Sequence, residues 1–221
     1  MSGGLPIDLI LFAMVAAFLV LRLRSVLGRR TGFERPPGEA PAGLGQAAPA
    51  READALPPPP AGAVRRGIPD PRSPVGQVLA RIRAVDPSFD PSAFLAGAEG
   101  AFRMIVQAFA AGDRETLRNL LSEEAYAGFE GAISAREQAG ETQRTEIRAI
   151  HDLSIEAADL RGTIADITVR IVSDQVNVTT ARDGSITAGA EAVTEITDLW
   201  TFQRDLRVPD PTWRLVGTRP A

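Results

Sequence analysis

The chain has 221 residues with 24 arginines and no lysine, 28 acidic residues, one histidine and no cysteine, and its net charge is −4. The absence of cysteine excludes disulfide frameworks, thiolate nucleophiles and cysteine-ligated metals. Residues 1–85 carry 11 arginines and 6 acids, a balance of +5, whereas residues 86–221 carry 13 and 22, a balance of −9. The acidic carboxyl-terminal part lacks the clustered basic footprint that nucleic acid requires, so we expect no nucleic-acid partner.

The amino-terminal stretch "LILFAMVAAFLVLRLRSVLGRR" (9–30) follows a run from Gly3 in which the only charge up to Leu21 is Asp8. Roughly 20 apolar residues are needed to cross a bilayer as a helix. Basic residues follow the run rather than precede it, and no A-x-A cleavage pattern appears in the arginine stretch, which is the opposite of a secretory signal. Residues 1–30 are therefore predicted to be a retained transmembrane anchor with a basic flank; the alternative is a buried core helix.

The spanning candidates are Leu9, Leu11, Phe12, Val15, Phe18, Leu19 and Leu21, and the membrane-flanking basic candidates are Arg22, Arg24, Arg29 and Arg30. Because positive charge favours the cytoplasmic side, the carboxyl-terminal domain is predicted to face the cytoplasm. The use of arginine in place of lysine is typical of a GC-rich bacterial genome. We therefore expect a single-pass protein of the bacterial inner membrane, with membrane lipid as the partner of the anchor.

Residues 31–74 contain 11 of the 17 prolines, including "LPPPPAGAV" at 56–64. The stretch has too few large apolar residues to form a core, and proline stiffens such a segment into an extended spacer. It is predicted to be a disordered linker; the alternative is a proline-rich docking ligand.

Residues 75–221 are predicted to form one domain that begins with helices. Residues 75–85 have apolar residues at helical spacing and indicate a short amphipathic helix, which either packs as the first helix of the domain or lies on the membrane surface. Three more helices are indicated by capping residues, with proline directly after the first cap and glycine at two of the ends. These caps are Asp90 and Gly112, then Asp113, then Ser122 and Gly140.

Beyond Gly140 the apolar period changes from helical to alternating, as in "TIADITVRIVS" (163–173), which is typical of half-buried strands. The residues 145–160 precede it as a strand, and two more strands are expected over 193–205 and 212–218, with a turn at "RDGS". The order of elements predicts an α+β fold with helices packed on a curved antiparallel sheet of about four strands.

Candidate catalytic groups are few. His151 falls on the strand face of Ile147 and Leu153 and is expected to be a packed or hydrogen-bonded core residue. One histidine without cysteine does not make a typical zinc site. Tyr126 with a buried aspartate, Asp166 or Asp198, is the remaining enzyme candidate. No Ser-His-Asp order, phosphate loop or metal motif is present. We therefore expect no enzyme, no cofactor and no metal.

The ordered segments "FLAGAEGAFRMIVQAFAAGDRETLRNLLSEEAYAGFEGAISAREQAG", "WTFQRD" and "DPTWRLVGT" resemble the Tim44-like domain family over residues 89–218. The residues that carry the resemblance are Phe94, Ala98, Ala101, Phe102, Ile105, Gly112, Asp113, Leu117, Leu120, Leu121, Phe129, Ile133, Arg136, Gly140, Trp200, Phe202, Arg204, Trp213 and Leu215. The resemblance implies a helix-backed, curved antiparallel sheet with a large apolar cavity, akin to the nuclear-transport-factor-two fold.

The resemblance also implies a function, because the namesake tethers the import-motor chaperone at the mitochondrial inner-membrane translocase. It suggests an inner-membrane adaptor or scaffold whose cytoplasmic domain binds a protein partner, in protein translocation, membrane-protein assembly or chaperone recruitment. The alternative is a module that binds lipid or another hydrophobic ligand at the membrane. A groove for such ligands, or for an unfolded segment, would use the interior aromatic and aliphatic side chains. These candidates are Phe102, Ile105, Phe109, Phe129, Ile133, Ile167, Val169, Trp200, Phe202 and Trp213.

Overall fold

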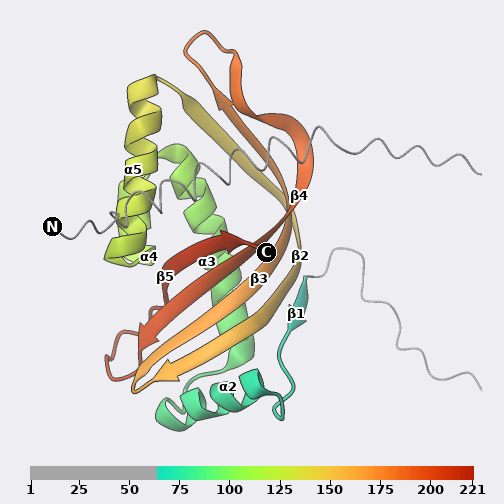
Figure 1. The fold of residues 1–221 in the computed structure, drawn as a ribbon, viewed down its shortest axis with the longest axis vertical. Helices are drawn as coiled ribbons and strands as arrows, with labels where there is room; N and C mark the ends of the chain where they lie inside the picture. Colours follow the sequence, from blue (N-terminus) through green and yellow to red (C-terminus); the bar gives the residue numbers. More distant parts are fainter. Residues whose placement is uncertain (1–63) are drawn as a thin grey trace, which may run out of the picture. The chain divides into compact units, whose positions relative to one another are not determined.

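The computed structural model describes residues 64–221, which contain four helices and five strands (Figure 1). The helices are α2 (Pro74–Val85), α3 (Pro91–Ala111), α4 (Arg114–Leu120) and α5 (Glu123–Ala139). The strands are β1 (Arg65–Gly67), β2 (Thr142–Arg161), β3 (Ile164–Thr180), β4 (Ile186–Asp205) and β5 (Arg214–Pro220). All five strands form one sheet in the order β1-β2-β3-β4-β5. The predicted α+β class is confirmed.

The helix ends follow the capping chemistry that the sequence predicts. The side chains of Asp90, Asp113 and Ser122 each accept a hydrogen bond from the backbone N–H three residues later, at the start of α3, α4 and α5. Gly112 and Gly140 end α3 and α5 in the left-handed conformation, with φ of 73° and 70°. A residue with a Cβ is disfavoured in that conformation, which explains why both helices stop at glycine.

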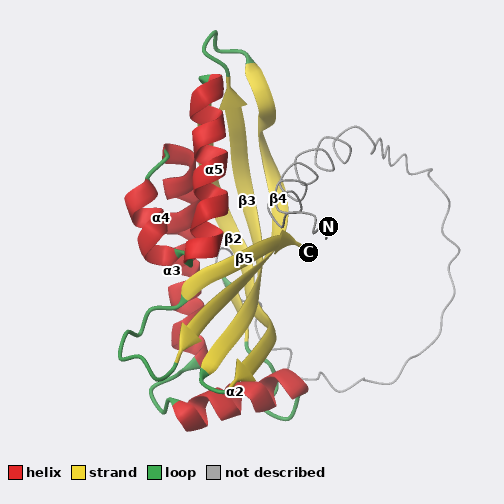
Figure 2. Ribbon diagram, turned by 60° about the vertical axis from the view of Figure 1, so that its left-hand side comes forward, coloured by secondary structure: helices red, strands yellow, loops and turns green. Residues whose placement is uncertain are grey.

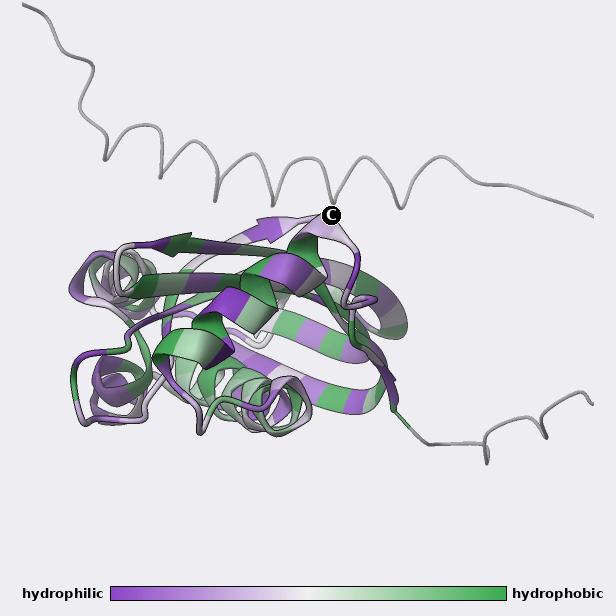
Figure 3. Ribbon diagram, turned by 90° about the horizontal axis from the view of Figure 1, so that it is seen from below, coloured by the Kyte–Doolittle hydropathy of each residue, from purple (hydrophilic) through white to green (hydrophobic). Residues whose placement is uncertain are grey.

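The helices α3, α4 and α5 lie on one side of the sheet, and the sheet curves along them (Figure 2). Alternate residues of β3 face this layer and are buried, namely Ala165, Ile167, Val169 and Ile171. Figure 3 shows hydrophobic and hydrophilic residues alternating along the strands, as expected for a sheet covered on one face. Together with Leu95, Phe102 and Ile105 of α3, these residues form the core.

Of the two alternatives for residues 75–85, the packed helix is confirmed. Leu79 and Ile82 of α2 are buried in the same core as the α3 side chains, and the helix packs against β2. Arg81 and Arg83 are exposed on the opposite side. The apolar stripe of α2 is therefore used inside the domain.

The sheet has five strands where about four were predicted, because β1 adds a short parallel strand at the edge. Arg65 pairs with Asp152 and Gly67 with Ser154 of β2. A Cβ on Gly67 would lie 2.6 Å from the Cβ of Ser154, so the close pairing requires glycine. This strand lies within the stretch 31–74 that the sequence assigned to the linker. Three residues are too few to show an alternating pattern, so this part of the sequence prediction is wrong.

The strands are longer than predicted, and β4 starts at Ile186 rather than near residue 193. Only the second half of β4 has neighbours on both edges, since β5 pairs with residues 198–203. We call residues 186–197 the distal half of β4 and residues 198–205 its proximal half. The distal half is exposed along most of its length, so it lacks the alternating apolar residues by which a half-buried strand is recognised.

The predicted anchor lies outside the described residues, so it stays a prediction. The residues concerned are Leu9, Leu11, Phe12, Val15, Phe18, Leu19, Leu21, Arg22, Arg24, Arg29 and Arg30. Within residues 64–221, no helix has the length and apolar character needed to span a membrane.

Candidate functional site

A row of aromatic rings runs through the interior between α3 and the last two strands. The ring of Phe94 lies 4.9 Å from that of Trp213 and 6.1 Å from that of Phe202, and the ring of Phe102 lies 4.9 Å from that of Trp200. All three contacts are edge-to-face, an arrangement that adds to the stabilisation from burial. The space between α3 and the last two strands is therefore occupied by these aromatic side chains.

A second aromatic contact joins α3 to α5, where the rings of Phe109 and Phe129 are 5.2 Å apart. The guanidinium of Arg136 lies 5.2 Å from the centre of the Phe109 ring, donates to the Phe109 carbonyl at 2.8 Å, and also donates to Gln143. Burial lowers the pKa of Arg136 from its usual range, but the guanidinium remains charged at neutral pH. Cation–π and hydrogen-bond contacts thus hold α5 to α3 and β2.

The candidate groove residues all belong to the core or pack against it. The buried ones are Phe102, Ile105, Ile133, Ile167, Val169, Trp200 and Phe202, and the partly buried ones are Phe109, Phe129 and Trp213. The structure therefore brings these residues together in one core. Two surface hollows of the described part of the chain are lined by other residues.

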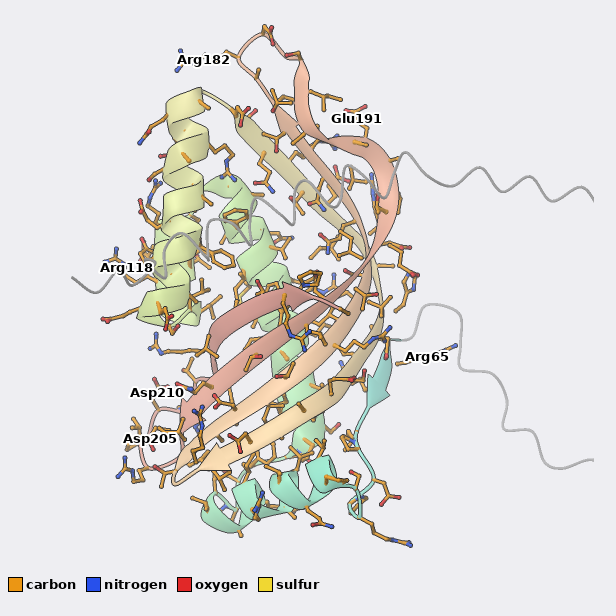
Figure 4. All side chains as sticks on the ribbon, viewed as in Figure 1. Arg65, Arg118, Arg182, Glu191, Asp205 and Asp210 are labelled. Atoms are coloured by element: carbon orange, nitrogen blue, oxygen red, sulfur yellow. The ribbon has the colours of Figure 1, made fainter. Side chains whose placement is uncertain are left out.

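The first hollow has a volume of about 320 Å³ and is lined by Arg114, Glu115, Arg118 and Tyr126. Arg118 donates to the Tyr126 hydroxyl at 3.1 Å, and its guanidinium lies 4.8 Å from the centre of the tyrosine ring (Figure 4 labels Arg118). The hydrogen bond to Tyr126 raises the pKa of Arg118. The hollow therefore offers surface hydrogen-bond donors.

The second hollow, of about 210 Å³, lies beside the turn between β4 and β5, where Figure 4 labels Asp205 and Asp210. Hydrogen bonds from Arg207, joined by one from Thr163, lower the pKa of Asp205 to about 2. Asp205 is therefore ionised at neutral pH and is poorly suited to general acid–base chemistry.

The enzyme candidate from the sequence does not assemble as one hydrogen-bonded pair. Tyr126 of α5 contacts Arg118, whereas Asp166 of β3 accepts hydrogen bonds from Arg161 and Gln203. Asp198 lies on β4, paired across the sheet with Ile171. Six carboxyl groups of the described residues have pKa values shifted downward, which is the direction that ion pairs and hydrogen bonds produce: those of Asp86, Asp113, Glu137, Asp183, Asp205 and Asp210.

The expected core position of His151 is wrong. Its side chain is 48% exposed, and its Nε2 lies 2.8 Å from Asp174 Oδ2. The reason is a β-bulge: Ile150 pairs with Ser173 and Asp152 with Val172, so His151 is an extra residue between consecutive pairs. A bulge breaks the alternation of faces on which the prediction depended.

Sequence reasoning passed over the Arg118–Tyr126 contact and the partners of His151. The spacing of Arg118 and Tyr126 crosses two helices, and no periodicity within one helix reveals it. The partners of His151 depend on register across three bulged strands. Only knowledge of the strand pairing would have indicated them.

Comparison with known protein families matches most of the described residues to one family. The model of the Tim44-like domain matches residues 75–220. A search of curated proteins finds no match. The solved structure of the intermembrane-space region of the chloroplast protein ARC6 is similar with 10% identity and a TM-score of 0.43, covering 57% of this chain and 94% of that one.

A candidate dehydratase of the NTF2-like family from Streptomyces avermitilis is similar with 16% identity and a TM-score of 0.34, covering 56% of this chain and 94% of that one. At these TM-scores, neither structure bears on the function of this chain. The family match, in contrast, covers most of the chain and the whole span from α2 to β5. The chain belongs to the Tim44-like domain family.

Proposed function

We propose that this protein is a membrane-tethered adaptor. Residues 5–27 anchor it in the bacterial inner membrane, the proline-rich segment gives reach, and the cytoplasmic domain binds a protein partner. The Tim44-like match over residues 75–220 carries the proposal, because this family consists of adaptor and scaffold proteins associated with membranes. Protein translocation, membrane-protein assembly and chaperone recruitment are the processes in which we place the partner.

The described domain supports a binding role better than catalysis. Its interior is occupied by aromatic contacts such as Phe102 with Trp200, and its perturbed carboxyl groups are ionised. Its exposed surface carries isolated apolar side chains, among them Met104 on α3, Val193 on β4 and Val208 in the following turn. Such side chains are available for contact with another protein.

The test is photo-crosslinking in cells from the full-length chain, with a photoactivatable residue at Met104, Val193 or Val208. These three exposed positions sample a helix, the distal half of β4 and a turn. Trp213 serves as the control, since it is partly buried and its ring contacts those of Phe94 and Phe89. We expect a discrete protein adduct from at least one exposed position, none from Trp213, and loss of the adduct when residues 5–27 are deleted.

The other outcomes decide against the adaptor. Lipid adducts without a protein adduct would favour the alternative, a module that binds lipid at the membrane surface. No adduct from any of the three exposed positions would contradict both binding functions.

A further inference from the structure

Three side chains that can bind metal lie on neighbouring strands: His151 on β2, Asp174 on β3 and Glu195 on β4. Each offers a ligand atom, and these atoms all lie within 4.8 Å of one another. Asp174 and Glu195 are direct cross-strand partners, and His151 Nε2 lies 2.8 Å from Asp174 Oδ2. The three groups therefore converge on one point of the sheet.

The group lies on the sheet face opposite the helices. Asp174 is three positions from the core residue Ile171 on an alternating strand, so its side chain points away from the core. Glu195, as its direct partner, shares that face. The bulge at His151 brings the imidazole to the same side, as its contact with Asp174 shows.

The charges at this point are unbalanced. Two carboxylates directly opposite each other on adjacent strands repel. Elsewhere in the described domain, acidic residues on the sheet form ion pairs with arginines. Arg144 pairs with Glu146 and Glu191, and Arg148 also pairs with Glu146. Glu195, in contrast, has no ion pair within residues 64–221, and the one ion-pair partner of Asp174 there is His151. A cation between the two carboxylates would relieve the repulsion.

We propose that His151, Asp174 and Glu195 bind a divalent transition-metal cation, with Zn²⁺ as the ion whose ligand preferences fit. An imidazole nitrogen with two carboxylates suits Zn²⁺, whereas Mg²⁺ and Ca²⁺ prefer oxygen ligands alone. The site is open to ions, since the His151 and Asp174 side chains are 48% and 29% exposed.

The geometry needs little adjustment. Zinc bonds of about 2.0–2.2 Å place tetrahedral ligand atoms about 3.3–3.6 Å apart. The present separations, from 2.8 Å to at most 4.8 Å, bracket that range, and Glu195 is an exposed side chain free to change rotamer. Three protein ligands leave a coordination position for water or for a side chain of a bound partner.

The experiment is calorimetric titration of ZnCl₂ into the full-length protein, purified without a polyhistidine tag, with MgCl₂ in parallel. We expect saturable binding of one Zn²⁺ and none of Mg²⁺ at the same concentrations. His151→Gln and Glu195→Gln should each weaken Zn²⁺ binding at least tenfold. Neither change alters a buried side chain, so the fold is kept.

Glu191→Gln is the matched control, because Glu191 is an exposed acid on the same strand that pairs with Arg144 instead (Figure 4). It should leave Zn²⁺ binding unchanged. His151 is the only histidine of the chain, so its imidazole NMR signals should shift on Zn²⁺ addition and report the site directly. Absence of saturable binding, or equal weakening by Glu195→Gln and Glu191→Gln, would overturn the proposal.

Discussion

Both halves of β4 pair with β3, but their surroundings are opposite. The proximal half lies between β3 and β5 and carries the buried Trp200 and Phe202. The distal half pairs with β3 alone, and Ile186 and Val193 are 53% and 56% exposed there. Burial, rather than strand formation, therefore determines what each half contributes. The buried proximal half stabilises the domain, whereas the exposed distal half is accessible to a partner.

The largest expected effect is in the proximal half. Phe202→Ala removes a fully buried ring that contacts Phe94 and Trp200, and should lower the free energy of unfolding by about 3–5 kcal/mol. Val193→Ala, in the distal half, should change it by less than about 0.5 kcal/mol. Urea denaturation of both variants checks the contrast; similar losses would contradict it.

The second largest loss of unfolding free energy is expected from breaking the ion pair between Arg204 of the proximal half and Asp86 at the end of α2. Its atoms are 2.9 Å apart, and the two side chains are 13% and 12% exposed. Asp86→Ala leaves a largely buried guanidinium without this partner and should cost about 1.5–3 kcal/mol. Arg214→Ala is the comparison, since its pair with Asp210 is exposed and 3.9 Å long, and a loss as large there would be unexpected.

A smaller loss of unfolding free energy is expected in the distal half, where one position requires glycine for its backbone conformation. Gly189 has φ of 79°, and a Cβ there would overlap the carbonyl oxygen of Asn177 on β3. The left-handed conformation alone should make Gly189→Ala cost about 1–2 kcal/mol, and the overlap should add to this cost, although no apolar side chain is lost. Thermal unfolding measures it, and Gly184→Ala, with φ of 84° but open space around it, separates the conformational cost from the overlap.

The smallest effect should be a pH dependence at the lower end of the proximal half. Because the pKa of Asp205 is about 2 in the folded state, below its unfolded value near 4, ionisation of this group stabilises the fold above about pH 4. That contribution is lost as the pH falls from about 4 to about 2. Thermal midpoints of the natural protein should decline more across this interval than those of Asp205→Asn, and parallel curves would contradict the assignment.

The helices of this domain could be predicted nearly to the residue, because each end is determined locally. Asp90 and Ser122 cap amides three residues away, and Gly112 and Gly140 supply the left-handed ends. The face of β3 that packs in the core could be predicted equally well, since Ile167 and Val169 belong to an uninterrupted alternation of apolar and polar residues.

Register could not be predicted. Counting back from the pair Thr180–Ile186 would place Asp174 opposite Ala192, whereas the irregularities of the ladder place it opposite Glu195. In the same way the bulge at His151 moved that residue out of the core. The sequence therefore identified the aromatic core residues but not the cross-strand cluster on the outer face.

The parallel strand β1 determines how a mechanical load would enter the domain. A pull on the chain that precedes residue 64 acts first on three residues of pairing with β2 and on the ion pair of Arg66 with Glu99, 3.1 Å long. These contacts are few and involve no aromatic core side chain. Their rupture would release residues 64–69, at most about 20–22 Å when fully extended, before the turn at residues 70–73 and α2 bear any tension. Under such a load, the contacts of β1 would therefore break before those of the core.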